Sequence, residues 1–352
     1  MRIPRYWFLL VLAPLSWIAD LATRNHLLTF FSAAGAVIPL AGLIGRSTEQ
    51  LALHAGPRVG GLLNATFGNI TELIIALFLI LDGDIGIVKA SMVGSIIGNL
   101  LLVLGAAILL GGLKHQEQRF NARAASVHST SLALAVTGLL MPALFVLLAQ
   151  GHHGFVQREV VSVTVALVLM ALYGAALVFT LVTHQHLFRT PTEDEHPSWS
   201  VRTSILVLVG ATALVALESE LLVGSLDATV SDLGLSRLFV GLILVPVIGN
   251  AAEHASAVFF ALRDKLDVAL EIAIGSSTQI ALFVAPVLVL ISLVAGHPMD
   301  FVFSPFEIAA VALSTFIVSL ISLDGRTNWL EGAQLLGAYV IMGVSFFFVE
   351  TL

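Results

Sequence analysis

The chain of 352 residues lacks cysteine altogether and carries little charge, since Asp, Glu, Lys and Arg together make up 11% of it. The absence of cysteine excludes disulfide bonds, thiolate metal sites and cysteine nucleophiles. A soluble chain has about 25% charged residues, so this composition does not suit a water-exposed globular surface. The net charge of −7 is spread over short connectors. Without a basic patch, nucleic acid is not an expected partner.

Hydrophobic residues are abundant, at 58% of the chain, which predicts an all-α polytopic protein in a lipid bilayer. Apolar runs of about 20 residues mark spanning helices. About eleven are predicted, at residues 6–22, 28–45, 60–81, 85–112, 125–149, 157–183, 202–224, 236–262, 268–295, 303–323 and 330–350. The first run, preceded by Arg2 and Arg5, also has the form of a signal peptide. No small-x-small cleavage site follows it, so we interpret it as a retained helix.

The distribution of basic residues predicts the orientation of the chain, because cytoplasmic loops are enriched in Lys and Arg. A cytoplasmic N-terminus puts 12 of the 16 basic residues inside and leaves Arg24, Lys89, Arg158 and Arg237 outside. The cytoplasmic set is Arg2, Arg5, Arg46, Arg58, Lys114, Arg119, Arg123, Arg189, Arg202, Arg263, Lys265 and Arg326. The C-terminus is then outside.

Two blocks of the chain repeat at a shift of 181 residues. The first is ATFGNITELIIALFLIL (65–81), matched by VPVIGNAAEHASAVFFALRDKL (245–266), and the second is SMVGSIIGNLLLVLG (91–105), matched by IAIGSSTQIALFVAP (272–286). The identical pairs are Gly68 and Gly249, Asn69 and Asn250, Glu72 and Glu253, Gly94 and Gly275, and Ser95 and Ser276. The Glu and Asn matches carry most of the weight, because Gly and Ser are common in membrane helices.

The predicted topology runs the two copies in opposite directions across the membrane, so they form inverted five-helix repeats. We expect an extra N-terminal helix at 1–27, a first repeat at 28–183, a weakly acidic linker at 184–201 and a second repeat at 202–352. Secondary transporters often have this plan, with the substrate site at the repeat interface and glycine-interrupted helices pointing to it.

The matched acids and amides predict an all-oxygen cation site. Asn69 and Glu72 are three residues apart, as are Asn250 and Glu253, so each pair shares one helix face. Gly68 and Gly249, helped by Pro246, allow the helices to open and free backbone carbonyls. The second block adds Ser95 and Asn99, and Ser276 and Gln279, as further ligands or hydrogen-bond partners. Such oxygens suit a hard cation such as Ca²⁺.

Two facing carboxylates also predict proton coupling, because desolvation and repulsion disfavour their charged forms when no metal is present. Protons and a divalent cation would compete for Glu72 and Glu253. His254 follows Glu253 and is equally well explained as a proton relay or as a packing residue. We expect Glu49, Glu218 and Glu220 to lie at solvated helix ends. A role on the path by which ions enter the site is the alternative. Glu307 is buried by pattern and unexplained, and the acidic run 193–195 reads as a solvated linker.

The motifs GNITE and GNAAEH, each followed by a GS block, closely resemble the two repeat motifs of the calcium/cation antiporter superfamily. The segments GGLLNATFGN, GSSTQIALFVAP and DGRTNWLEG look like its cation/proton exchanger branch, and the resemblance runs from about residue 28 to the C-terminus. It implies eleven helices, frequent oligomers, and Glu72 and Glu253 carrying Ca²⁺ and H⁺ in turn. Family members have an acidic connector, whereas this one is only weakly acidic.

The predicted function is therefore a Ca²⁺/H⁺ antiporter without cofactors, not an enzyme. Na⁺ coupling or a preference for Mn²⁺ are the nearest alternatives. An intramembrane hydrolase is disfavoured because the chain has no H-E-x-x-H or G-x-S-x-G motif. A cation channel is disfavoured because two acids on inverted halves do not form a carboxylate ring. We expect a bacterial plasma membrane, with a vacuolar membrane as the alternative.

Overall fold

The computed structural model describes residues 5–148, 155–187 and 197–349, and helices dominate these residues. In the labels used here, η marks 3₁₀ or π-helical turns. The first part of the chain forms η1 (Arg5–Val11), α1 (Leu12–Ile18), η2 (Ala19–Thr23), α2 (His26–Ala55), α3 (Pro57–Phe67), α4 (Ile70–Asp82), α5 (Ile85–Ile97), η3 (Gly98–Val103), α6 (Leu104–Lys114), β1 (Gln118–Arg119), α7 (Ala122–Leu148), α8 (Phe155–Val178), η4 (Phe179–Thr183) and η5 (Gln185–Leu187).

The second part repeats the pattern of long helices with short irregular turns. It forms α9 (Val201–Gly224), α10 (Leu226–Leu233), α11 (Arg237–Phe239), η6 (Val240–Leu244), α12 (Val245–Gly249), α13 (Ala251–Ala261), α14 (Leu266–Leu270), η7 (Glu271–Gly275), α15 (Ser276–Gln279), η8 (Ile280–Val284), α16 (Ala285–Ala295), α17 (Pro305–Ile321), β2 (Arg326–Thr327) and α18 (Trp329–Phe348).

The prediction of an all-α polytopic membrane protein is confirmed. Among the described residues, eight helices are long and apolar enough to cross a membrane, or nine when a bent pair counts as one span. Two shorter apolar helices, Trp7–Thr23 and Pro305–Ile321, lie where the first and tenth spans are predicted. Every predicted apolar run is thus helical, while the number of eleven crossings stays a prediction. The acidic run 193–195 lies outside the described residues.

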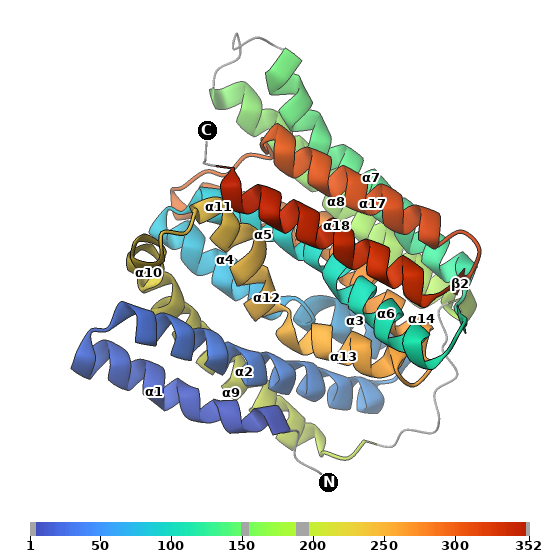
Figure 1. Cartoon of the computed structure of the whole chain (residues 1–352), viewed down its shortest axis with the longest axis horizontal. Helices are drawn as coiled ribbons and strands as arrows, with labels where there is room; N and C mark the ends of the chain where they lie inside the picture. The colour runs from blue at the N-terminus through green and yellow to red at the C-terminus, as the bar shows by residue number, and fades with distance from the viewer. Residues whose placement is uncertain (1–4, 149–154, 188–196, 350–352) are drawn as a thin grey trace.

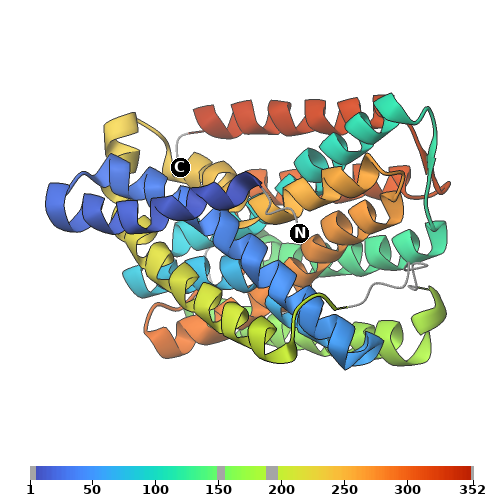
Figure 2. The same ribbon diagram turned by 90° about the horizontal axis from the view of Figure 1, so that it is seen from below.

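The helices at one edge of the molecule form a separate layer (Figure 1). There α1 and α9 lie against α2. Seen from below, the three helices lie in front of the rest of the protein (Figure 2). Helix α5 lies inside the protein, where it contacts α4, α17 and η6, and its residues from Ile87 to Ile97 are almost all buried.

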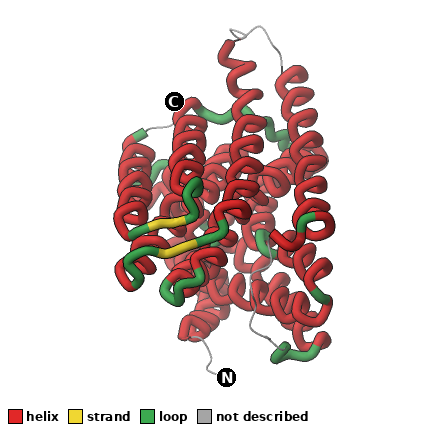
Figure 3. Tube along the Cα trace, turned by 90° about the vertical axis from the view of Figure 1, so that its right-hand side faces the viewer, coloured by secondary structure: helices red, strands yellow, loops and turns green. Residues whose placement is uncertain are grey.

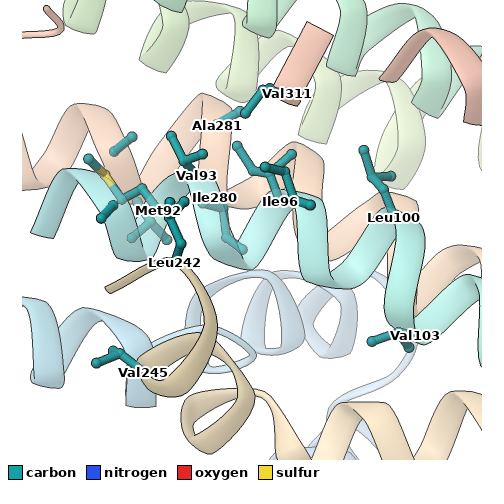
Figure 4. Packing of buried hydrophobic residues seen from close by; sticks show 14 of the residues in the cluster. Met92, Val93, Ile96, Leu100, Val103, Leu242, Val245, Ile280, Ala281 and Val311 are labelled. Atoms are coloured by element: carbon teal, nitrogen blue, oxygen red, sulfur yellow. The ribbon is translucent and has the colours of Figure 1, made fainter. Parts of the chain in front are cut away.

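The centre of the protein is an apolar core around α5 and η3. Their side chains lie in one cluster with residues of η6, α12, η8 and α17, so segments far apart in sequence meet there (Figure 4). Met92, Val93 and Ile96 lie beside Leu242 and Ile280, and each is at most 4% exposed. Burial of such side chains contributes about 1.5–3 kcal/mol each relative to water, although lipid reduces that driving force between membrane helices.

The backbones of α5 and η6 cross unusually closely at two glycines. A Cβ atom on Gly94 would lie 2.1 Å from the carbonyl oxygen of Leu242, and one on Gly241 would lie 2.6 Å from the Cβ of Ala90. Small residues permit such contacts between membrane helices. We call this contact the α5–η6 crossing.

Glu218 corrects one expectation from the sequence. It is not a solvated helix end: its side chain is fully buried on α9 and accepts hydrogen bonds from Ser16 Oγ (2.7 Å) and Trp17 Nε1 (3.0 Å). A buried carboxylate needs such donors, and here they fasten α1 to α9. The sequence missed this because the partners are about 200 residues away. Glu49 and Glu220 are exposed, as expected of helix ends.

The role of Glu307, which the sequence leaves unexplained, is to cap a helix. Glu307 is the third residue of α17 and forms a reciprocal capping box with Ser304, which satisfies free amides of the helix N-terminus.

The strands β1 and β2 pair antiparallel, with Gln118 opposite Thr327 (Figure 3). This ribbon, absent from the sequence prediction, joins the segment after α6 to the segment before α18.

The α5–η6 crossing predicts that alanine substitutions at two glycines of one continuous helical segment will affect stability differently. Gly94→Ala should push the helices apart and lower stability by about 1–3 kcal/mol, because overpacking forces the backbones to shift. Gly98→Ala adds a methyl group with no atom within 4 Å of it and should have little effect. Thermal unfolding of the detergent-solubilised protein measures both. Equal melting temperatures for the two variants would contradict the close crossing.

Candidate functional site

Two helices are interrupted at matched positions. The segment between α3 and α4 is Gly68–Asn69, and Asn250 separates α12 from α13. The backbone angles at the two asparagines are similar, with φ −106° and ψ 22° at Asn69 and φ −98° and ψ 6° at Asn250. The second pair is bent by 62°, whereas the first remains straight enough to form one span over Val59–Asp82. The predicted glycine-linked openings are therefore present in both halves.

Each interruption puts a carboxylate in the first turn of a new helix. Glu72 lies in the first turn of α4, and Glu253 lies in the first turn of α13. The free amides and the dipole at a helix N-terminus stabilise negative charge by about 0.3–1 kcal/mol. The helix break thus stabilises the charged form of a carboxylate at a position where lipid would disfavour that charge.

A chain of hydrogen bonds connects the first interruption to the second half. Asn69 Nδ2 donates to Gln279 Oε1 at 2.6 Å, and Asn69 Oδ1 accepts from Ser276 Oγ at 3.0 Å. Asn99 Nδ2 in turn donates to Ser276 Oγ at 3.2 Å. Both the amino group and the carbonyl oxygen of the Asn69 side chain are therefore hydrogen-bonded, and residues of α15 fix the orientation of this amide.

The second interruption is tied to the first half in the matching way. Asn250 Nδ2 donates to Ser95 Oγ on α5 at 3.2 Å and to the carbonyl oxygen of Pro246 at 3.0 Å. Asn69 pairs with Ser276, and Asn250 pairs with Ser95, so each broken helix is hydrogen-bonded to the GS block of the other half. The two motifs thus form one site rather than two.

The carboxylates lie in the middle of this network. Glu72 and Glu253 interact electrostatically, and the Ser276 hydroxyl is a hydrogen-bond partner of Glu253. A Cβ on Gly249 would lie 3.4 Å from Glu72 Cγ, so the side chain of Glu72 packs directly on the interruption of the opposite half. Gly249 leaves the room that this contact needs.

Three buried oxygens of the site have no hydrogen-bond partner among the described residues: Glu72 Oε2, Glu253 Oε2 and Asn250 Oδ1. All three are acceptors, and an unsatisfied buried acceptor costs about 1–3 kcal/mol. A hard cation satisfies such oxygens directly. The described residues contain no cluster of three or more His, Asp or Glu side chains suited to a metal ion, so a cation here would also need amide, hydroxyl or carbonyl oxygens.

The structure brings together all eight residues predicted to form the site: Glu72, Glu253, Asn69, Asn250, Ser95, Asn99, Ser276 and Gln279. Their role as cation ligands stays a prediction. His254 follows Glu253 on α13, and its half-buried side chain forms no hydrogen bond with this network among the described residues. A relay role for His254 therefore gains no support.

A cavity of about 500 Å³ reaches this network from one side. Its lining residues include Gly61, Asn64, Tyr173, Gly275 and Gln279. Gln279 both lines the cavity and accepts from Asn69, so it connects the cavity wall to the network. We call this space the α3–η7 cavity, after two of the segments that line it.

Sequence reasoning missed two charged groups in the wall of the α3–η7 cavity. His128 Nε2 on α7 lies 2.9 Å from Glu271 Oε2 on η7. The side chain of His128 is 16% exposed and that of Glu271 is 60% exposed. One signal was available, since Glu271 lies one helical turn before the GS block, whereas Ala90 occupies the matched position of the first half.

The two halves differ in how closely their matched helices approach. The α5–η6 crossing is closed, but the equivalent contact on the cavity side is open. The three atoms nearest to a Cβ on Gly60, the match of Gly241, all belong to Ala52 on α2, and a Cβ on Gly275, the match of Gly94, would meet only atoms of Glu271, one turn earlier in its own helical segment. The site is therefore shut off along one side and approached by a cavity along the other.

Paired helix interruptions and a polar network that is shared between two halves and reached by a cavity are the features of a secondary transporter that works by alternating access. The chain belongs to the family described as sodium/calcium exchanger protein, whose profile matches residues 25–182 and 203–348.

Similar proteins extend over nearly the whole chain. A Ca²⁺/H⁺ antiporter of Synechocystis sp. (strain ATCC 27184 / PCC 6803 / Kazusa) is 45% identical over 98% of this chain and 97% of its own. The Ca²⁺/H⁺ antiporter ChaA of Bacillus subtilis (strain 168) is 44% identical over 97% of this chain and 99% of its own. The solved structure of native YfkE, 40% identical, superposes with a TM-score of 0.86 over 98% of this chain and 100% of that one.

The hydrogen-bond network predicts different roles for two adjacent serines. Ser276→Ala removes the hydroxyl that joins Asn69, Asn99 and Glu253, and should weaken Ca²⁺ binding roughly tenfold, about 1.4 kcal/mol. Ser277→Ala removes a hydroxyl that donates to Ala273 O in its own helical segment (2.8 Å) and lies 3.5 Å from Ile96 O on α5, but contacts none of the site's amides or carboxylates, so it should leave Ca²⁺ binding unchanged. Equilibrium binding of radioactive Ca²⁺ to purified protein distinguishes them. An equal loss in both variants would argue against a site centred on Ser276.

Proposed function

We propose that this protein is a secondary transporter that exchanges Ca²⁺ for H⁺ by alternating access. Glu72 and Glu253 bind the cation and protons in competition. The observation that carries the proposal is the group of three buried, unpartnered acceptor oxygens from both halves, Glu72 Oε2, Glu253 Oε2 and Asn250 Oδ1. The names of the Synechocystis and Bacillus subtilis relatives support Ca²⁺ and H⁺ as the exchanged ions.

Competition between the ions follows from the chemistry of the two carboxylates. A divalent cation needs both ionised, whereas two ionised carboxylates without a cation repel each other in a medium that solvates neither. Protons remove that repulsion when the cation leaves. The empty, doubly charged site is thus the least favourable state, and the ions replace one another.

The matched interruptions support the division into two inverted repeats. On this proposal the extra N-terminal helix is 1–27, the repeats are 28–183 and 202–352, and the linker is 184–201. The cross-connected pairs, Asn69 with Ser276 and Asn250 with Ser95, are what a two-fold relation between the halves would produce.

The predicted orientation assigns the α3–η7 cavity to the cytoplasmic side. His128 and Glu271 lie within about two turns of helix ends that carry Arg123 and Lys265, members of the predicted cytoplasmic set. The described conformation would then be open to the cytoplasm, and the α5–η6 crossing would be the closed outer barrier. In a bacterial plasma membrane this arrangement suits export of Ca²⁺.

The first prediction from this function concerns ion flux. Ca²⁺ uptake into proteoliposomes should depend on an imposed pH gradient, and Glu72→Gln or Glu253→Gln should abolish it, since the amide cannot carry a proton or balance the cation charge. Glu220→Gln, at an exposed position of α9, is the matched control and should transport normally.

Other results would change the proposal in defined ways. Uptake driven by a sodium gradient would keep the site and replace the coupling ion. Normal transport in both site variants would reject the paired-carboxylate mechanism. Unitary currents in planar bilayers would indicate a channel instead of a carrier.

A second prediction concerns the sidedness of the α3–η7 cavity. The chain has no native cysteine, so Ser131→Cys introduces a unique thiol in the cavity wall. A membrane-impermeant maleimide should label it in inside-out vesicles but not in right-side-out vesicles. The reverse pattern would place the cavity outside and invert the predicted topology.

A further inference from the structure

The α5–η6 crossing shows what a closed barrier looks like in this protein. Gly94 and Gly241 allow the backbones to approach, and the third residue at the contact is Ala90, whose Cβ lies 2.6 Å from the Cβ that Gly241 lacks. The barrier is thus built from residues that are small and uncharged. It excludes water by direct contact between backbones.

The shift of 181 residues identifies the matching positions on the open side. They are Gly275 for Gly94, Gly60 for Gly241 and Glu271 for Ala90. Two of the three are again glycines, so a barrier of the same kind can form there. The third is an acid, and its Oε1 lies 3.7 Å from the Cβ that Gly275 lacks. Closing the α3–η7 cavity in the same way would therefore enclose Glu271 in the contact.

Enclosure is unfavourable for an ionised carboxylate, which loses the water that the open cavity provides. His128 is the group that can offset the charge, since its Nε2 lies 2.9 Å from Glu271 Oε2. Other titratable groups are less well placed. Tyr173 lines the same cavity, Asp267 accepts from the backbone amide of Asn121 at 2.6 Å, and Glu253 is not among the residues that line the cavity.

We propose that Glu271 and His128 form a charge-controlled gate: the α3–η7 cavity closes when Glu271 is neutralised by protonated His128, and stays open when Glu271 is a lone carboxylate. The gate rests on the proposed alternating access but uses neither of the central carboxylates. Both residues act on the conformational step and are positioning residues rather than cation ligands.

The gate is tested by rescue in a Ser131→Cys background. His128→Asn leaves Glu271 without a positive partner. It should raise maleimide labelling of the cavity and slow Ca²⁺/H⁺ exchange, each on the order of tenfold. Glu271→Ala restores the residue type found at Ala90 in the closed barrier, so the double variant should return both readouts close to those of the parent. Glu271→Ala alone should label no more than the parent.

Rescue separates a gate from a structural ion pair, because a lost structural contact would not be restored by removing the second partner. Slow exchange in the double variant, equal to that of His128→Asn, would overturn the gate. Unchanged labelling in His128→Asn would overturn it as well. The parent protein reports separately on the proposed function: if it moves no Ca²⁺ on a pH gradient, the exchanger proposal fails, while the labelling series still tests the gate.

Discussion

The structure depends on one constraint, the placement of two carboxylates beside each other inside a membrane protein. Lipid cannot solvate Glu72 and Glu253, so the protein surrounds them with helix N-termini, amides and hydroxyls. Those groups become available because two helices are interrupted at Asn69 and Asn250. The interruptions require the opposite half to supply partners, Ser276 for Asn69 and Ser95 for Asn250. The shared core around α5 follows from this exchange of partners.

Glycine has a second role, in deciding which parts of the two halves can meet. At the α5–η6 crossing a carbonyl oxygen occupies the space of a missing side chain. On the other side the same residue types stand apart, with a cavity between them. The two copies of the repeat therefore have different surroundings: matched segments are in contact on one side and apart on the other. This difference describes the conformational state of the protein. The bend of 62° at only one of the interruptions belongs to the same asymmetry.

Much of this arrangement could be predicted from the sequence, because membrane helices are long and their apolar runs contain few charged residues. The 181-residue shift located the paired motifs, and spacing along a helix put Asn69 and Glu72 on one face. What escaped prediction depends on contacts between distant segments. Glu218 looked like a helix end until Ser16 and Trp17 supplied its donors. Glu271 matches Ala90 in the repeat, so a search for identical residues in the two halves did not find it.

The β-ribbon has a mechanical consequence for this molecule. Gln118 and Arg119 pair with Thr327 and Arg326, and α6 and α18 meet where a Cβ on Gly332 would lie 2.2 Å from the amide nitrogen of Leu109. Two helices from different halves are thus clamped both along their length and at their connecting segments. Moving one half as a rigid body against the other would therefore require both the β-ribbon and the contact between α6 and α18 to break.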